Sequence, residues 1–100
     1  MKQVVFHPEA FQELDEAVAY YAERSLWAAT AFEEAVEKAV RSIATAPTRH
    51  AFLRQTGMRA FRLKRFPYLI IYEELRDQLW IAAVAHERRH PDYWRRRRPQ

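Results

Sequence analysis

The spacing of hydrophobic residues changes near the middle of this chain, and this change constrains the fold more than any other feature. Between residues 8 and 43 apolar side chains recur three and four positions apart, which is the period of an amphipathic helix. After residue 60 they alternate with polar residues or form short continuous runs, which is typical of strands. At 100 residues the chain suits one domain. We therefore expect a single α+β domain.

Two helices are predicted in the first half. A short β-branched and aromatic stretch, residues 2–6, precedes them and is predicted to be a strand. Pro8 suits the first turn of a helix, because its missing N–H would be unpaired there, so a helix is predicted over residues 8–24. Ser25 can cap a second helix, which should end at Pro47. The short connection between them predicts an antiparallel helical hairpin.

Three strands are predicted in the second half. Apolar and basic side chains alternate in residues 60–66, and two apolar runs follow at residues 68–73 and 79–86. Their short connections indicate an antiparallel meander. The expected order is β-α-α-β-β-β, with an antiparallel sheet and a helical hairpin packed on one face. We expect the opposite face to stay partly open, with Arg62 and Lys64 on it.

Composition and charge exclude several classes of protein. Residues 1–50 hold 8 acidic and 5 basic side chains, whereas residues 51–100 hold 5 acidic and 12 basic ones, which favours an anionic partner for the second half. The absence of cysteine fits a reducing compartment. The opening residues lack the pattern of a secretory signal, and no apolar run is long enough to cross a membrane. We therefore expect a cytoplasmic protein without a membrane partner.

The stretch HERRHPDYWRRRR, residues 86–98, holds most of the candidate site residues. Basic and aromatic side chains that converge on a half-open sheet can bind phosphates and unstacked bases. Cleavage of RNA would require a base, an acid and fixed cations, and His86, His90 or Tyr93 could act as the acid or the base. Arginines could only stabilise charge. HERRH lacks the HExxH pattern and no glycine-rich loop is present, so we expect no metal and no cofactor.

Each of these features also has a purely structural interpretation. Tyr93 and Trp94 could simply pin the end of the chain to the domain. We divide the chain into a domain over residues 1–94 and an arginine-rich, solvated tail over residues 95–100. His86 could be an ordinary surface or core residue. The carboxylates of the first helix are predicted to form one solvated face: Glu9, Glu13, Asp15, Glu16 and Glu23.

Four stretches together resemble the RelE/ParE superfamily of toxins from bacterial type II toxin–antitoxin systems. They are HPEAFQELDEAVAYYAE, AATAFEEAVEKAVRSIATAP, RAFRLKRFPYLIIYE and IAAVAHERRHPDYW, and they span nearly the whole chain. The resemblance rests on their order and spacing, because no single motif is specific. It implies the same β-α-α-β-β-β order. It also implies a cognate antitoxin whose C-terminal segment covers the active surface in a toxin–antitoxin hetero-oligomer.

The superfamily divides by target. For a RelE-like member, which cuts mRNA on the ribosome, the resemblance implies a loose match of the catalytic set to His86, Arg88, Tyr93, Arg62 and Lys64. ParE-like members lack the nuclease set and poison DNA gyrase through their surface and C-terminal end. The FPYLIIY strand and the H-x-R-R-x-P-x-x-W ending look more like ParE.

We therefore expect a toxin that binds and inhibits gyrase and is not an enzyme. The expected target-binding residues are Arg62, Lys64, Arg88, Arg89, Tyr93 and Trp94. A ribosome-dependent mRNA endoribonuclease is the alternative. A nucleic-acid binder driven by the arginine run is a third, and its affinity should fall steeply with salt.

Overall fold

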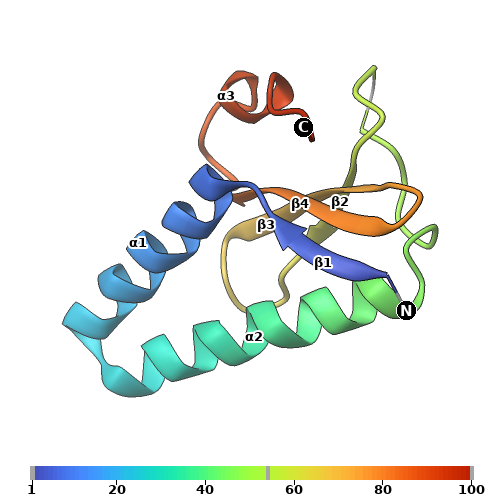
Figure 1. The fold of residues 1–100 in the computed structure, drawn as a ribbon. Helices are drawn as coiled ribbons and strands as arrows, with labels where there is room; N and C mark the ends of the chain where they lie inside the picture. Colours follow the sequence, from blue (N-terminus) through green and yellow to red (C-terminus); the bar gives the residue numbers. More distant parts are fainter. Residues whose placement is uncertain (1, 54, 100) are drawn as a thin grey trace.

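The computed structural model describes residues 2–53 and 55–99, and its α+β element order confirms the one expected from the sequence (Figure 1). The elements are β1 (Gln3–Phe6), α1 (Pro8–Arg24), α2 (Leu26–Thr45), β2 (Arg59–Arg62), β3 (Tyr68–Glu74), β4 (Gln78–His86) and α3 (Asp92–Arg95). The bounds of α1 agree with the expected ones at both ends. The short helix α3 was not predicted.

Local capping fixes the helical hairpin. The Nδ1 atom of His7 accepts a hydrogen bond from the backbone N–H of Glu9, and Pro8 occupies the first turn of α1. The Ser25 N–H donates to the Tyr21 carbonyl at 2.8 Å, while its hydroxyl oxygen accepts from the N–H of Ala28 at 3.4 Å. Ser25 therefore ends α1 and begins α2, so one residue makes the whole connection.

The sheet has the strand order β1-β4-β3-β2. Strands β2, β3 and β4 form the predicted antiparallel meander, but β1 pairs with β4 in parallel. The sheet is therefore mixed, and the expectation of a wholly antiparallel sheet was wrong on this point. The physical reason is that α1 and α2 carry the chain to the far edge of the sheet, and the meander then returns until β4 lies beside β1. Short connections in the sequence predict pairing only between consecutive strands, so they could not predict the pairing of β1 with β4.

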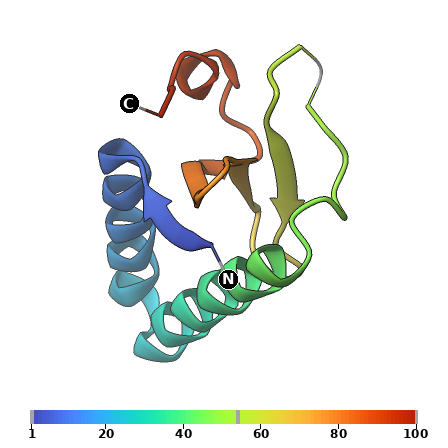
Figure 2. The same cartoon turned by 45° about the vertical axis from the view of Figure 1, so that its right-hand side comes forward.

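The helical hairpin covers one face of the sheet, as expected (Figure 2). The core on this face contains Ala10, Ala17, Phe32, Val36, Ala39, Ile43, Leu63, Ile70, Tyr72, Leu79, Ile81 and Val84, all buried. Rings pack edge to face within it, and the centroids of Phe32 and Tyr68 lie 5.2 Å apart. The Tyr72 hydroxyl donates to the Pro47 carbonyl at 2.7 Å and so ties the sheet to the end of α2.

The opposite face of the sheet is covered by the chain's own C-terminal segment, so the expectation of a half-open face was wrong. Trp94 is only 5% exposed and packs in a second cluster. The cluster contains Met58, Ile71, Trp80, Ala82, Ala83, Ala85 and Trp94. A strand that is apolar on both faces needs cover on both sides, and the continuous apolar run of β4 is such a strand. In Figure 2 the sheet lies between the helices and the C-terminal segment that includes α3.

Candidate functional site

A β-bulge in β4 shapes the C-terminal end of the molecule. Ile71 pairs with Ala83 and Tyr72 pairs with Ile81, so Ala82 is an extra residue in β4. A bulge leaves backbone groups without their usual partners in the sheet. Here side chains from two distant segments supply those partners.

Glu13 and Arg97 form a buried ion pair at this bulge. The Arg97 guanidinium donates to both carboxylate oxygens of Glu13, at 3.1 and 2.9 Å, and to the Ala82 carbonyl at 2.9 Å. The N–H of Val84 donates to Glu13 at 3.0 Å. The two side chains are only 12% and 8% exposed. The pair therefore joins α1, β4 and the C-terminal segment, and we call it the Glu13–Arg97 latch.

Sequence reasoning missed the latch, because it assigned Glu13 to a solvated helix face and Arg97 to a solvated tail. One signal was available. Glu13 lies three residues after Ala10 and four before Ala17, and both alanines are buried, so Glu13 is on the inward side of α1. The end of the chain makes a further contact with the domain, since Arg98 donates to the Thr56 carbonyl at 3.1 Å.

Five of the six arginines in residues 86–98 are exposed, and Arg98 is the one of these five that bonds to the domain, through Thr56 and Glu73. Arg88, Arg89, Arg95 and Arg96 are exposed, and none of them forms a salt bridge with a carboxylate in the part of the chain that the structure describes. We call these four residues the C-terminal basic surface. The Arg89 guanidinium lies over the Tyr93 ring, 3.6 Å from its centroid.

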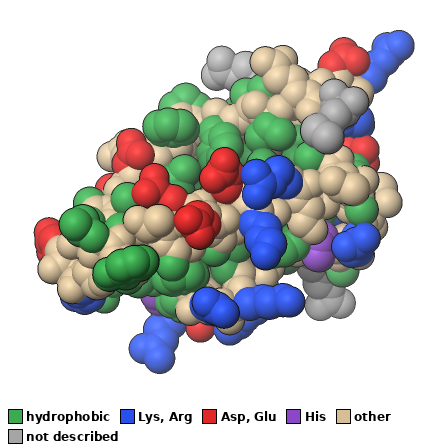
Figure 3. Space-filling model, turned by 90° about the horizontal axis from the view of Figure 1, so that it is seen from below, with side chains coloured by type: hydrophobic (Ala, Val, Ile, Leu, Met, Phe, Trp, Pro, Cys, Tyr) green, Lys and Arg blue, Asp and Glu red, His purple; other side chains and the backbone are tan. Residues whose placement is uncertain are grey.

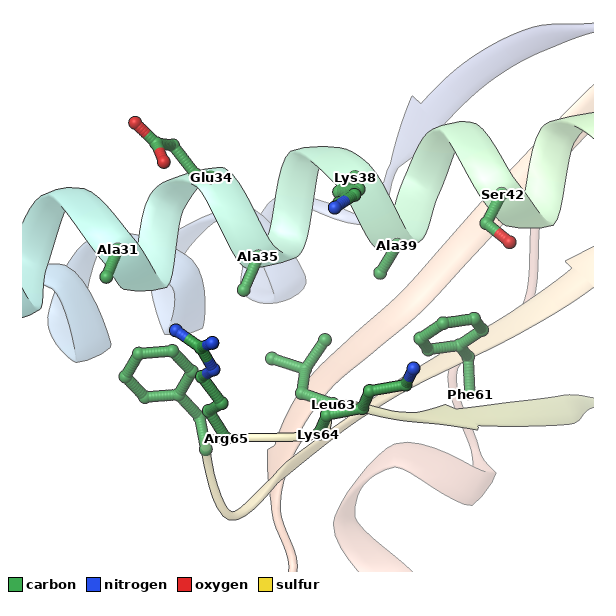
Figure 4. Close-up of a pocket in the computed structure, with 11 residues that line it drawn as sticks. Ala31, Glu34, Ala35, Lys38, Ala39, Ser42, Phe61, Leu63, Lys64 and Arg65 are labelled. Atoms are coloured by element: carbon green, nitrogen blue, oxygen red, sulfur yellow. The ribbon is translucent and has the colours of Figure 1, made fainter.

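The structure separates two basic residues that the sequence placed on one open face. Arg62 forms a salt bridge with Glu87 at 2.8 Å, next to the end of β4. Lys64 instead lines a groove beside α2, where Figure 4 shows it with Lys38 and Ser42. Arg62 is thus neutralised close to His86 and Arg88, while Lys64 belongs to a different surface.

Of the three candidate proton-transfer residues, His90 is exposed and its Nδ1 accepts from the N–H of Asp92 at 3.3 Å, while His86 and Tyr93 are held against the domain. His86 ends β4, its ring packs against Tyr68, and its Nδ1 accepts from the N–H of Arg88 at 3.1 Å. Burial and the nearby charge of Glu13 raise the pKa of Tyr93, although Arg89 and Arg97 oppose this shift. A tyrosine with a raised pKa is a poor general base at neutral pH. Trp94, a candidate for target contact, is buried because its side chain packs in the second cluster against the sheet.

A groove of about 530 Å³ runs between α2 and the β2–β3 turn (Figure 4). It is lined by Ala31, Glu34, Ala35, Lys38, Ala39, Ser42, Phe61, Leu63, Lys64, Arg65 and Phe66. Its walls are largely apolar, and its three cations outnumber its one carboxylate. Trp27, which is 87% exposed, lies four residues before Ala31 on the same side of α2. Figure 3 shows apolar side chains exposed at the end of the molecule that carries the α1–α2 turn.

Among residues 2–53 and 55–99, no group of three or more His, Cys, Asp or Glu side chains could hold a metal ion. No helix in the same ranges is long and apolar enough to cross a membrane.

Comparisons with known proteins agree with this architecture. Residues 4–91 match the family model described as ParE toxin of type II toxin-antitoxin system, parDE. The fold is similar to a solved structure titled "Chromosomal ParDE TA system from P. aeruginosa", with a TM-score of 0.73 and 19% sequence identity. The match covers 86% of this chain and 96% of that one. A search of curated protein sequences finds no significant match.

Proposed function

Because the chain belongs to the ParE toxin family of type II toxin–antitoxin systems, we propose that it inhibits DNA gyrase by binding it and that an antitoxin neutralises it. The C-terminal basic surface is the observation that carries the proposal for the target. Trp94 and the latch fix the backbone on either side of Arg95 and Arg96, and Arg89 packs on the Tyr93 ring, so little conformational entropy is lost when a partner binds them. Such a surface suits recognition by contact.

The arrangement of the candidate nuclease residues favours binding over RNA cleavage. Cleavage would need free cations beside an acid and a base. Glu87 neutralises Arg62, and Lys64 faces the α2 groove on another surface. Tyr93 carries Arg89 on its ring and has a raised pKa. The ribosome-dependent endoribonuclease therefore remains the weaker alternative.

The groove beside α2 is where we place the antitoxin. Its apolar lining fits the nonpolar face of a partner segment, and its excess of Lys38, Lys64 and Arg65 over Glu34 fits acidic residues along that segment. An acidic segment that is disordered when free could fold as it enters the groove. The product is a toxin–antitoxin hetero-oligomer in which the antitoxin covers part of the toxin surface.

One experiment separates the two target classes. Gyrase supercoiling and mRNA cleavage on purified ribosomes would be measured with the wild type, with Arg88→Ala/Arg89→Ala and with His86→Ala/Tyr93→Phe. We expect supercoiling to be inhibited, the arginine variant to need about tenfold more protein, equivalent to about 1.4 kcal/mol, and the His/Tyr variant to remain inhibitory. The nuclease would instead be established if the wild type cleaved mRNA and left gyrase uninhibited, and if the His86→Ala/Tyr93→Phe variant no longer cleaved mRNA.

The antitoxin site has its own test. Lys64→Glu/Arg65→Glu should weaken the affinity for the antitoxin, because it reverses two charges on the groove. Arg49→Glu/Arg76→Glu is the matched control, since it also reverses two charges, and both residues are exposed and lie outside the lining of this groove. Equal affinities of the two variants, measured by calorimetry, would refute the groove as the docking site.

Two further proposals follow from the same arrangement. Gyrase acts on DNA in the bacterial cytoplasm, so a toxin that inhibits gyrase must be present there, and we propose a cytoplasmic location for this protein. Because Arg97 is buried and Arg98 bonds to Thr56, we also propose that the folded domain extends through Arg98 and not only to Trp94.

A further inference from the structure

We propose that the C-terminal basic surface binds the phosphate backbone of duplex DNA directly, without reading its sequence. This binding goes beyond the inhibition of gyrase and does not depend on which enzyme the toxin targets.

The structure divides the arginines of the C-terminal stretch into two groups. Arg97 and Arg98 bond to the chain's own Glu13, Ala82 and Thr56. Arg88, Arg89, Arg95 and Arg96 are exposed and form no salt bridge among the described residues. Four guanidinium groups are therefore available to an external anion. Each can donate two parallel hydrogen bonds to a phosphate.

The two central arginines are held in place on both sides. Trp94 precedes Arg95 and is buried, and Arg97 follows Arg96 and is part of the latch. The N–H of Arg97 also donates to the Trp94 carbonyl at 3.0 Å, so the helical turn continues past α3. Since the inward residues are three apart, Arg95 and Arg96 project outward. This differs from a free tail, because the backbone is already ordered before the anion binds.

The acidic residues are distributed so that a long polyanion fits the C-terminal basic surface better than a short acidic peptide does. Asp92 is the one carboxylate between residues 88 and 98, and it lies 3.4 Å from the ring of His90. The acidic half of the chain, residues 1–50, forms β1 and the helical hairpin. A long, uniformly charged molecule would be attracted to the basic end and repelled by α1, which holds five carboxylates and one arginine, and this orients it.

The aromatic residues favour duplex DNA over single strands. Proteins that bind single strands without sequence preference stack bases on open aromatic rings. Trp94 is buried, and the Arg89 guanidinium covers the Tyr93 ring at 3.6 Å. Neither ring offers a stacking platform. Recognition of base edges in a groove needs a helix or ribbon that can enter it, and α3, with four residues, is too short. The mode of binding that fits this surface is therefore contact with the phosphates of duplex DNA, without recognition of its bases.

The test measures how the affinity for a short DNA duplex depends on salt, using the full chain without gyrase. Each phosphate contact contributes about 0.9 to the slope of log affinity against log salt. Four contacts predict a slope of about −3.6, so doubling the salt should weaken binding about 12-fold. Arg95→Ala/Arg96→Ala should lower the slope to about −1.8, which is a loss of about 3.5-fold per doubling. Single-stranded DNA of equal length should bind no better than the duplex.

A second variant removes the same charge from the opposite end of the molecule. Arg24→Ala/Arg41→Ala lies on the helices, where Arg24 covers Tyr20 and Arg41 pairs with the exposed Glu37. It should keep the wild-type slope, and circular dichroism should show that both variants are folded. Equal slopes for the two variants would overturn the proposal, because binding would then follow net charge alone. Preference for single strands, or binding of polyglutamate but not of DNA, would overturn it as well. None of these results would affect the gyrase proposal, which is measured separately.

Discussion

Replacing Glu13 with alanine should destabilise the protein by about 3–5 kcal/mol, because the buried Arg97 would then keep only the exposed carboxylate of Glu9, 3.3 Å from its Nε. Glu13 accepts three hydrogen bonds, two from Arg97 and one from the Val84 N–H. The lost bond to Val84 alone leaves a buried donor unpaired, which costs about 1–3 kcal/mol. These costs overlap and do not add in full. Against a total stability of about 5–15 kcal/mol, the loss is large.

Urea denaturation monitored by tryptophan fluorescence measures this loss, and a thermal scan provides a second readout. For a domain of this size each kcal/mol shifts Tm by about 4–8 °C, so Tm should fall by at least about 12 °C. Glu37→Ala is the matched control. Glu37 lies 3.9 Å from Arg41, and both side chains are 71% exposed, so its removal should change the free energy of unfolding by less than about 0.5 kcal/mol.

A double-mutant cycle with Arg97→Ala tests whether the two residues act as a pair. The double variant should be more stable than the sum of the single losses implies, by at least about 1 kcal/mol, because neither charge is then buried alone. Additive losses, or a loss below about 1 kcal/mol for Glu13→Ala, would refute the reasoning. Either result would mean that the carboxylate is solvated and that Trp94 and the Arg98–Thr56 bond hold the C-terminal segment without the latch.

Three more predictions concern aromatic residues. Burial raises the pKa of Tyr21, Tyr68, Tyr72 and Tyr93 above its ordinary value, so the unfolded chain loses these protons first. The contribution of these tyrosines to stability should stay constant up to about pH 10 and fall above it, and urea titrations above pH 10 should show a smaller fall for Tyr93→Phe. Tyr72→Phe removes the bond to Pro47 and should cost about 1 kcal/mol in the same urea assay at pH 7. Trp27→Ala should leave Tm unchanged, since Trp27 is 87% exposed, but should weaken antitoxin binding in calorimetry, and an unchanged affinity would exclude Trp27 from that interface.

Local signals were sufficient to predict the helical hairpin. Pro8, Ser25 and the apolar spacing act within a few residues of the elements they define, and the structure places α1 and α2 where these signals indicated. The direction of β1 beside β4 depends on the path of the whole chain.

The cover on the second face of the sheet could have been inferred from β4, whose apolar run leaves neither face polar. The sequence interpretation relied instead on Arg62 and Lys64, which alternate with Phe61 and Leu63. The structure has β2 only over Arg59–Arg62, at the edge of the sheet, so the strand predicted over residues 60–66 was too long and Leu63 and Lys64 lie in the turn after β2. The polar residues of an edge strand do not show whether the same face of the central strands is exposed.

The arginine run from 95 to 98 mixes two roles that composition cannot separate. All four side chains contribute equally to a charge count, yet Arg97 is 8% exposed while Arg95 and Arg96 are exposed. Spacing explains the difference, because Trp94 and Arg97 lie three residues apart in a helical turn and both face the domain. Loss of Arg97 should therefore reduce stability, and loss of its two neighbours should reduce binding to anions. An alanine scan that found the same phenotype at all four positions would contradict this division and return the run to the status of a solvated tail.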